Sequence, residues 1–280
     1  MRRFVPLALL LATTAACQVT DGTTTMDPST TGETHPPGEQ ATITFVFDGD
    51  SFEASVDGRV EEIRLLGINA PEEDECFSEQ SRDALISAVD GQEVVLVRGG
   101  SEDRDDFGRL LRYVYLDGRN INEAMLFHGH AVAVHGEHNL NDGFVFVMDD
   151  AALDELGMWS PNACGPATHR DVVIEWVEFN PRGPDDEVLG DEYVEIVNNG
   201  SLMVDLTGWT LRDESSQNRY RFDRVLRPGD RVLVRSGCGN DGGEDAFWCS
   251  DHSIWSNGGD NAILQDEHGN VVSWWSYRGG

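Results

Sequence analysis

The stretch ATITFVFDGDSFEASVDGRVEEIRLLGI, residues 41–68, decides the fold of the N-terminal half of the chain. Residues 41–47 alternate threonine with β-branched or aromatic residues, which is the pattern of a β-strand. Residues 51–56 and 59–68 continue as strands, and Asp57-Gly58 between them favours a tight hairpin turn. We therefore predict three consecutive strands at the start of this half.

The residues that follow alternate between helical and strand patterns. Ala84, Leu85 and Ala88 fall on one helical face, which predicts a helix over residues 78–89. Further strands are predicted at 92–98 and 110–116, and further helices at 121–128 and 145–156. A five-stranded barrel with helices between and after its strands accounts for this order, and we assign it to residues 41–165.

The second half, residues 166–280, is predicted to be a separate β-sandwich. Short strand-like runs recur there between turn signals, at 172–179, 192–197, 209–212, 219–222, 231–234, 262–265 and 271–275. About seven short strands in a segment of this length are typical of a β-sandwich. The fold class is therefore mainly β, with two domains.

Residues 1–17 have the pattern of an export signal. Arg2 and Arg3 precede an apolar run at 4–12, which is too short to span a bilayer. Thr14-Ala15-Ala16-Cys17 resembles a bacterial lipobox, in which Cys17 is lipidated and becomes the new N-terminus. We expect an exported chain, anchored by this lipid at the extracellular face of the cell membrane. Ordinary signal-peptidase cleavage, which gives a secreted protein, is the alternative.

Residues 18–40 are rich in Thr, Gly, Pro and Ser and nearly free of large apolar side chains. Such a segment cannot bury enough surface to fold. We predict a flexible tether between the lipid and the barrel.

Four further cysteines, Cys76, Cys164, Cys238 and Cys249, favour disulfides in an oxidising compartment. They allow three pairings. We favour Cys76–Cys164 and Cys238–Cys249, because each pair then lies within one predicted domain. Four free buried thiols are the alternative.

The net charge is −31, from 51 acidic and 20 basic residues, and all the basic residues are arginines. A charge of this sign repels nucleic acids at low salt. It counts against binding to a polyanion unless a local positive site or a bound metal overrides it.

Residues 64–72 carry the richest set of reactive side chains. On a strand, Arg64 faces opposite to Leu65 and can reach a phosphate with two parallel hydrogen bonds. The side-chain oxygen of Asn69 and the main-chain carbonyl of Ala70 are candidate metal ligands, and Glu72 is placed to bind or deprotonate a water. The alternative for Arg64 is a surface pair with a neighbouring glutamate.

Two shorter motifs flank this segment in the sequence. Asp48 and Asp50, on either side of a glycine, can turn toward a hard cation such as Ca²⁺, which prefers oxygen ligands. Arg109, after the run 105–108, is suited to neutralise the charge that builds up on a five-coordinate phosphorus. Each motif alone is also common in plain turns.

Together the motifs DGDS (48–51), IRLLGINAPE (63–72) and DDFGR (105–109) resemble the staphylococcal nuclease, or thermonuclease, family, in the family's order and over about residues 41–165. The resemblance implies an OB-type five-stranded barrel with three helices. It implies water attack on a phosphodiester bond of DNA or RNA.

The same resemblance implies a role for each site residue. Ca²⁺ is expected to be held by Asp50, Asn69 and the carbonyl of Ala70. Glu72 is expected to be the general base or to position the water, while Arg64 and Arg109 stabilise the phosphate and the transition state. The family usually has Asp where this chain has Asn69, so we expect weaker Ca²⁺ binding, for which Asp48 can compensate.

Residues 166–280 resemble the lamin-tail domain family. The matching motifs are GDEYVEIVN (190–198), LTGWTLRD (206–213), LRPGDRVLV (226–234) and WSNGGDNAILQDEHG (255–269). The resemblance implies an immunoglobulin-like sandwich that binds or tethers an unknown ligand, and it supplies no catalytic residues to carry over to this chain.

The sequence therefore predicts a secreted or surface-anchored, Ca²⁺-dependent nuclease that acts on DNA or RNA. The alternative is a catalytically silent, surface-displayed binding or adhesion protein with a decayed nuclease domain. Retention of Asp50, Arg64, Glu72 and Arg109 favours the enzyme.

Overall fold

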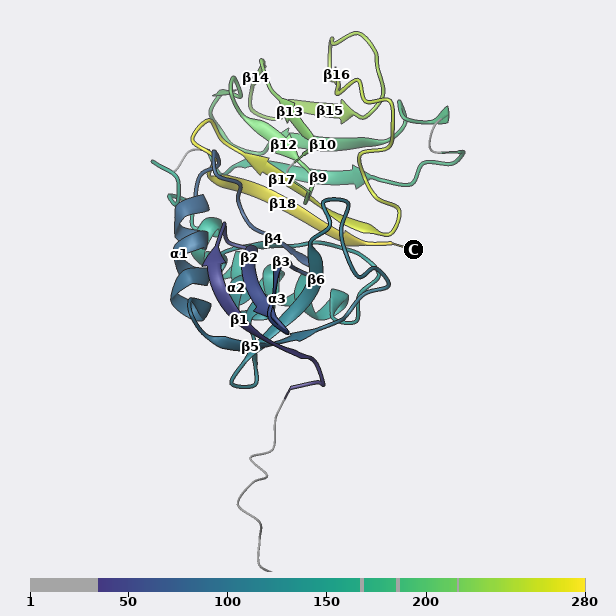
Figure 1. Ribbon diagram of the computed structural model, residues 1–280. Coiled ribbons are helices and arrows are strands. Elements are labelled where there is room, and N and C mark those ends of the chain that lie inside the picture. The colour runs from purple at the N-terminus through teal and green to yellow at the C-terminus, as the bar shows by residue number, and fades with distance from the viewer. Residues whose placement is uncertain (1–34, 167–168, 185–186, 216, 280) are drawn as a thin grey trace, which may run out of the picture. The chain divides into compact units, whose positions relative to one another are not determined.

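The computed structural model describes residues 35–166, 169–184, 187–215 and 217–279 (Figure 1). The predicted signal peptide, its lipidation site Cys17 and most of the predicted tether lie outside the described residues. Within the described part of the chain, no helix is both long enough and apolar enough to cross a membrane.

Five strands of the N-terminal half close into the predicted barrel. They are β1 (Glu39–Val46), β2 (Ser51–Val56), β3 (Arg59–Leu65), β5 (Glu93–Val97) and β6 (Leu110–Leu116). The order is β3-β2-β1-β5-β6, and a parallel pairing of β3 with β6 completes the circle. Short strands extend it: β7 (Arg119–Asn120) pairs with β6, and β4 (Ile68–Asn69) pairs with β8 (Val132–Ala133).

Alternating side chains fill the barrel as its sequence predicted. Phe52, Ile63 and Val114 come from different strands and are fully buried in its core. Asp57 and Gly58 both have positive φ angles, 49° and 76°, as the tight turn between β2 and β3 requires.

The prediction of one continuous strand over 59–68 is wrong. Strand β3 ends at Leu65, and the chain turns at Gly67, whose φ of +77° is strained for any residue with a Cβ. The turn returns the chain as β4. Arg64 and Asn69 are thereby placed on either side of a bend rather than along one strand.

Three helices cover the barrel: α1 (Ser78–Val89), α2 (Ile121–Phe127) and α3 (Asn141–Leu153). The first two match their predicted positions closely, but α3 begins and ends earlier than the predicted 145–156. At its start, the side chain of Asn141 accepts a hydrogen bond from Gly136 N. At its end, positive φ angles at Glu155 and Gly157 stop the helix before the short 3₁₀ turn Gly157–Trp159.

The C-terminal half is the predicted β-sandwich. One sheet has the order β16-β15-β10-β9, and the other has the order β13-β12-β17-β18. The strands of the first sheet are β9 (Val172–Glu178), β10 (Tyr193–Asn198), β15 (Arg231–Arg235) and β16 (Asp245–Phe247). Those of the second are β12 (Thr210–Arg212), β13 (Arg219–Arg221), β17 (Gly259–Gln265) and β18 (Val271–Arg278), and a small pair is formed by β11 (Val204–Asp205) and β14 (Val225–Leu226). Trp209 and Trp255 are buried in the sandwich core.

The two halves share apolar packing. Ile263 and Val271, from β17 and β18, belong to the same buried cluster as the barrel core. The rings of Trp159 and Trp274 lie 5.5 Å apart between their centroids. Residues 34–280 accordingly form one compact unit.

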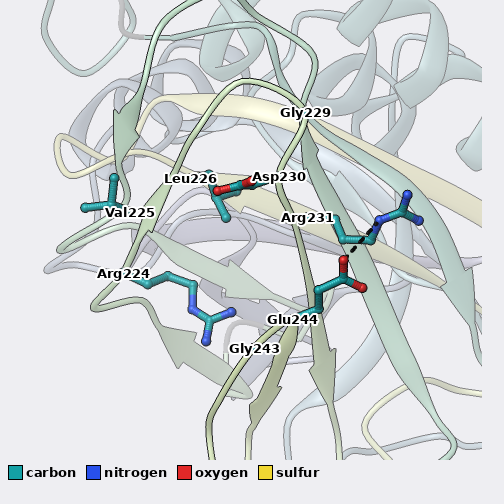
Figure 2. A pocket seen from close by; sticks show the side chains of 8 residues that line it. All are labelled: Arg224, Val225, Leu226, Gly229, Asp230, Arg231, Gly243 and Glu244. Atoms are coloured by element: carbon teal, nitrogen blue, oxygen red, sulfur yellow. Dashed lines mark ion pairs between the residues drawn. The ribbon is translucent and has the colours of Figure 1, made fainter.

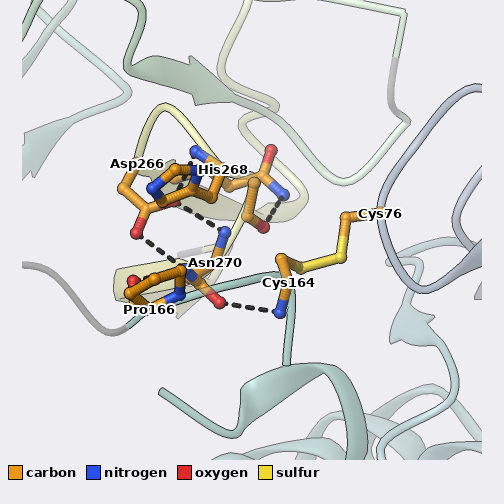
Figure 3. The surroundings of a disulfide bond; sticks show 8 residues. Cys76, Cys164, Pro166, Asp266, His268 and Asn270 are labelled. Carbon is orange, nitrogen blue, oxygen red and sulfur yellow. Dashed lines mark hydrogen bonds between the residues drawn. A yellow bond between two sulfur atoms is a disulfide. The ribbon is translucent and has the colours of Figure 1, made fainter. Parts of the chain in front are cut away.

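Both predicted disulfides, Cys76–Cys164 and Cys238–Cys249, are present. Figure 3 shows that the first lies against the β17–β18 turn of the sandwich. Cys164 N donates to Asn270 Oδ1 at 2.8 Å, and Asn270 Nδ2 donates to Asp266 Oδ2 at 2.8 Å. The Cys76–Cys164 disulfide therefore joins the segment after Glu72 to the junction between the two halves.

Candidate functional site

The three predicted motifs meet at one cavity of about 540 Å³. Its lining includes Asp48 and Asp50 from the first motif, Arg64, Asn69 and Glu72 from the second, and Arg109 from the third. This volume lies in the range of small-ligand sites. Ala70 is buried beside Asp50 rather than on the cavity wall.

The Asp-Gly-Asp turn brings Asp50 against the second motif. A Cβ on Gly49 would lie 2.7 Å from the Cβ atoms of Ala70 and Ser81, so this approach requires glycine. Asp50 Oδ2 accepts a hydrogen bond from Ala70 N at 2.6 Å. Asp48 accepts from Asp50 N at 2.9 Å and from Ser51 Oγ at 2.6 Å, so part of its role is to hold the turn.

The guanidinium of Arg64 is held by carboxylate, carbonyl and amide groups. Its Nε lies 3.1 Å from Asp50 Oδ1, which makes the alternative of a surface pair with a neighbouring glutamate wrong. Its terminal nitrogens donate to Leu65 O, to Ile68 O and to Asn69 Oδ1 at 2.9, 2.6 and 2.9 Å. The bend at Gly67 is what brings those last two acceptors back toward the guanidinium.

Arg109 is oriented by its own turn. Its Nε donates to Asp105 Oδ2 at 2.7 Å, while Asp105 Oδ1 accepts from Phe107 N and Arg109 N at 3.0 and 2.9 Å. Partial burial raises the pKa of Asp105, but the hydrogen bonds from Arg109 outweigh it and hold the pKa below its usual value. Asp105 therefore stays ionised and fixes Arg109.

Phe107 is a site residue that the sequence reasoning missed. Its side chain lines the cavity, is 79% exposed and lies with its ring centroid 5.4 Å from Arg109 Cζ. A large apolar ring left in water at a cavity rim is suited to stack on a flat ligand. The available signal was a phenylalanine inside an otherwise acidic and polar turn.

Burial and mutual repulsion perturb the acids of the cavity. Burial, opposed by Arg64 and assisted by Asp48, raises the pKa of Asp50 to about 7. Burial and the charges of Asp48 and Glu75 also raise the pKa of Glu72, which Arg64 and Arg109 only partly offset. The site thus concentrates negative charge that its two arginines do not fully balance.

These groups fit a hard cation in chemistry, because every candidate ligand is an oxygen. The excess negative charge at Asp48, Asp50 and Glu72 would be relieved by a divalent ion. Asn69 is constrained, since its oxygen accepts from Arg64 while its Nδ2 donates to Glu214 O at 3.1 Å. Among the described residues, no group of three or more His, Cys, Asp or Glu side chains is already arranged as a metal site.

A second cavity, of about 460 Å³, lies in the sandwich (Figure 2). It is lined by charged side chains that include Arg224, Arg231 and Glu244, and Arg231 Nε lies 3.9 Å from Glu244 Oε1. It contains none of the predicted site residues, and we assign it no role.

Comparison with known proteins agrees with both halves. The model of the family described as "Staphylococcal nuclease homologue" matches residues 62–161, and that of "Lamin Tail Domain" matches residues 166–279. An uncharacterized endonuclease of Escherichia coli is 33% identical over 116 residues, which are 41% of this chain and 73% of the relative. The SPbeta prophage-derived endonuclease YokF of Bacillus subtilis is 32% identical over 130 residues, 43% of this chain and 44% of YokF. A micrococcal nuclease of Shigella flexneri is 30% identical over 132 residues, 43% of this chain and 74% of the relative.

Proposed function

The chain belongs to the staphylococcal nuclease family and carries a lamin tail domain after it, and on that premise we propose that it is a Ca²⁺-dependent endonuclease that hydrolyses phosphodiester bonds of DNA or RNA. One observation carries the proposal. Two arginines, a glutamate and two aspartates from three separate motifs line a single cavity.

The arginines supply the positive charge that a phosphate needs in an otherwise acidic molecule. Among the guanidinium nitrogens of Arg109, only Nε has a carboxylate partner in the described part of the chain, so its terminal nitrogens can serve a phosphate. Arg64 is fixed from behind by Asp50 and the bend, which sets its direction before a substrate arrives. Fixed donors of this kind stabilise developing charge with little reorganisation.

Glu72 is the group we assign to the water. Its raised pKa moves this carboxylate nearer to neutral pH, where a general base is most effective. It accepts a proton from water as the water oxygen attacks phosphorus, and the bond to the leaving oxygen breaks. Ca²⁺, when held by Asp50 and Asp48 together with Asn69 and the main-chain carbonyl of Ala70, would neutralise phosphate charge.

The assay that tests this proposal uses purified residues 34–280 with single-stranded DNA, duplex DNA and RNA. Calcium and salt are titrated separately, because a net charge of −31 repels a polyanion until it is screened. We expect cleavage that requires Ca²⁺. Glu72→Gln should lower the rate by about 10²–10⁴-fold, and Arg64→Ala should be similarly impaired. Absence of cleavage at every salt and calcium concentration contradicts the proposal.

The acidic composition favours a second candidate, a silent surface-displayed binding protein. It predicts that Glu72→Gln and the unmodified protein behave alike, binding a partner without turnover. The same set of assays therefore separates the two candidates.

We also propose that the protein is exported and held at the membrane by a lipid on Cys17. The apolar run and the lipobox-like sequence before Cys17 support this proposal. Metabolic labelling with palmitate should mark the protein, and Cys17→Ser should abolish the label. An unlabelled protein in the medium would favour plain secretion instead.

A further inference from the structure

A hairpin of the lamin tail domain reaches the nuclease cavity. The hairpin consists of β12, β13 and the described residues 213–215, 217 and 218 between them, and two of its side chains, Ser215 and Gln217, line the cavity. Strand β12 also pairs with β17, so the sandwich fixes the hairpin.

A first link joins the hairpin to the arginine side of the site. Asn69 is 7% exposed and donates from Nδ2 to the main-chain carbonyl of Glu214 at 3.1 Å, while its Oδ1 accepts from Arg64. An aspartate at this position has no N–H to donate and would set a carboxylate oxygen against the carbonyl. The amide therefore connects Glu214 to Arg64.

The carbonyl in this link is itself held in place. The side chain of Glu214 accepts from His135 N at 2.7 Å and from Asn261 Nδ2 at 2.9 Å, and its Oε2 lies 2.7 Å from His135 Nδ1. Asn261 Nδ2 also donates to Ala133 O at 2.8 Å. These bonds join the sandwich to the end of the barrel that carries β8 and fix the position of the carbonyl.

A second link joins the hairpin to the glutamate side of the site. Arg219, on β13, forms an ion pair and hydrogen bond with Glu75 Oε1. The other carboxylate oxygen of Glu75 accepts from Glu72 N at 3.1 Å. One carboxylate thus transmits the position of Arg219 to the main chain at Glu72.

We propose that the β12–β13 hairpin is a positioning element of the nuclease site, acting on Arg64 through Asn69 and on Glu72 through Glu75. The inference rests on the proposed nuclease function and extends it, since it makes the lamin tail domain part of the active-site framework. Neither Arg219 nor Glu214 touches the reacting atoms in this scheme. Both act by fixing residues that do.

The test is a double-mutant cycle in the full chain on Arg219 and Glu75. Arg219→Ala and Glu75→Ala should each lower kcat about tenfold with little change in KM, because loss of position affects the reacting geometry. The double variant should lose no more than either single variant, because both remove one link. Arg219→Lys, which keeps the charge, should recover most of the loss.

Arg231→Ala is the matched control. Arg231 pairs with Glu195 at 2.6 Å on the other sheet of the same domain and lies 3.9 Å from Glu244, so its removal also breaks arginine–glutamate pairing. It should leave kcat unchanged. Equal losses in Arg219→Ala and Arg231→Ala, or a kcat for Arg219→Ala equal to that of the unmodified protein, would overturn the proposal.

Amide hydrogen exchange separates this proposal from the nuclease proposal. Exchange over residues 66–77 should become faster in Arg219→Ala and not in Arg231→Ala, whether or not the protein cuts nucleic acid. Unchanged exchange there overturns the positioning role. Faster exchange in a protein without cleavage supports the positioning role and contradicts the nuclease function.

Discussion

The side chain of Asn69 donates a hydrogen bond to the main-chain carbonyl of Glu214, 145 positions further along the chain. This bond joins a candidate metal-ligand position of the barrel to the second domain. It accounts physically for an amide where the family pattern has a carboxylate. The same replacement leaves the site with less negative charge for a cation.

Asn69→Asp should exchange stability for calcium affinity. The new carboxylate would have no N–H to donate to the Glu214 carbonyl. In the absence of calcium, we therefore expect the free energy of unfolding to fall by about 1–3 kcal/mol. Added Ca²⁺ should recover part of this loss and should bind more tightly than in the unmodified protein. Chemical denaturation with and without Ca²⁺ measures both effects.

Asn139→Asp is the control for that experiment, because Asn139 is exposed and the change adds the same charge away from Glu214. Equal stability of the two variants would show that the bond between Asn69 and Glu214 contributes nothing.

Phe107→Ala should weaken substrate binding more than it slows the reaction. An exposed ring at the cavity rim can stack on a base, and such stacking contributes about 1–3 kcal/mol per base. We expect KM for single-stranded DNA to rise about 5–100-fold with kcat nearly unchanged. Phe146→Ala removes a ring that is 61% exposed on α3 and should leave KM as it was. A similar rise in both variants would argue against stacking.

The two disulfides should contribute unequally to stability. Cys76–Cys164 spans 88 residues and Cys238–Cys249 spans 11, and the longer loop loses more chain entropy when it is closed. Replacing both cysteines of the first pair by serine should lower the free energy of unfolding by about 2–5 kcal/mol. The corresponding double serine variant of the second pair should lose less. Thermal unfolding of the two variants ranks them, and the reverse order would contradict the expectation.

His138 and His130 should each cost the barrel stability as the pH falls below neutrality, while Asp50, whose pKa is raised to about 7, contributes in the opposite direction. Burial, only partly offset by the hydrogen bond to Val134 O, lowers the pKa of His138, and burial also lowers that of His130. The unfolded chain therefore binds these protons at a higher pH than the folded chain does, so the contribution of the two histidines to stability is present above the unfolded pKa and falls as the pH drops through it.

Urea denaturation at pH 8 and pH 5 of the unmodified protein and of His138→Gln isolates the contribution of His138. Between pH 8 and pH 5 the free energy of unfolding should change more favourably in the variant than in the unmodified protein. The glutamine side chain can still form a hydrogen bond with Tyr113, whose hydroxyl lies 2.7 Å from His138 Nδ1. If the free energy of unfolding depended on pH in the same way in the two proteins, His138 would not be the group that takes up the proton.

Local patterns predicted most of the barrel. The alternation in β1 to β3, the Asp57-Gly58 turn and the helical spacing of α1 are properties of neighbouring residues, and all three were confirmed. The start of α3 was missed because it contains Asp142 and Gly143, which favour turns when read alone. The short strands β11, β14 and β16 of the sandwich were not predicted, because two or three residues carry too little pattern.

The order and spacing of the motifs predicted that the candidate residues lie together, but they could not show which residues surround them. Asp50, Arg64, Glu72 and Arg109 line one cavity as the three motifs predicted. The parts played by Glu214 and Arg219 depend on how two domains pack, and no periodicity links positions so far apart. From the sequence, Asn69 indicated only a weaker calcium ligand; the structure adds its hydrogen bonds to Glu214 and Arg64.

Ile263 and Val271, which lie in the lamin tail sequence but belong to the buried cluster that contains the barrel core, bear on how such proteins can be recombined. A nuclease that exchanged this tail for an unrelated module would uncover the apolar surface that these two side chains now cover. Exposed apolar surface of that kind promotes aggregation. Exchange of one domain of this chain would therefore require compatible apolar residues on the other side of the boundary.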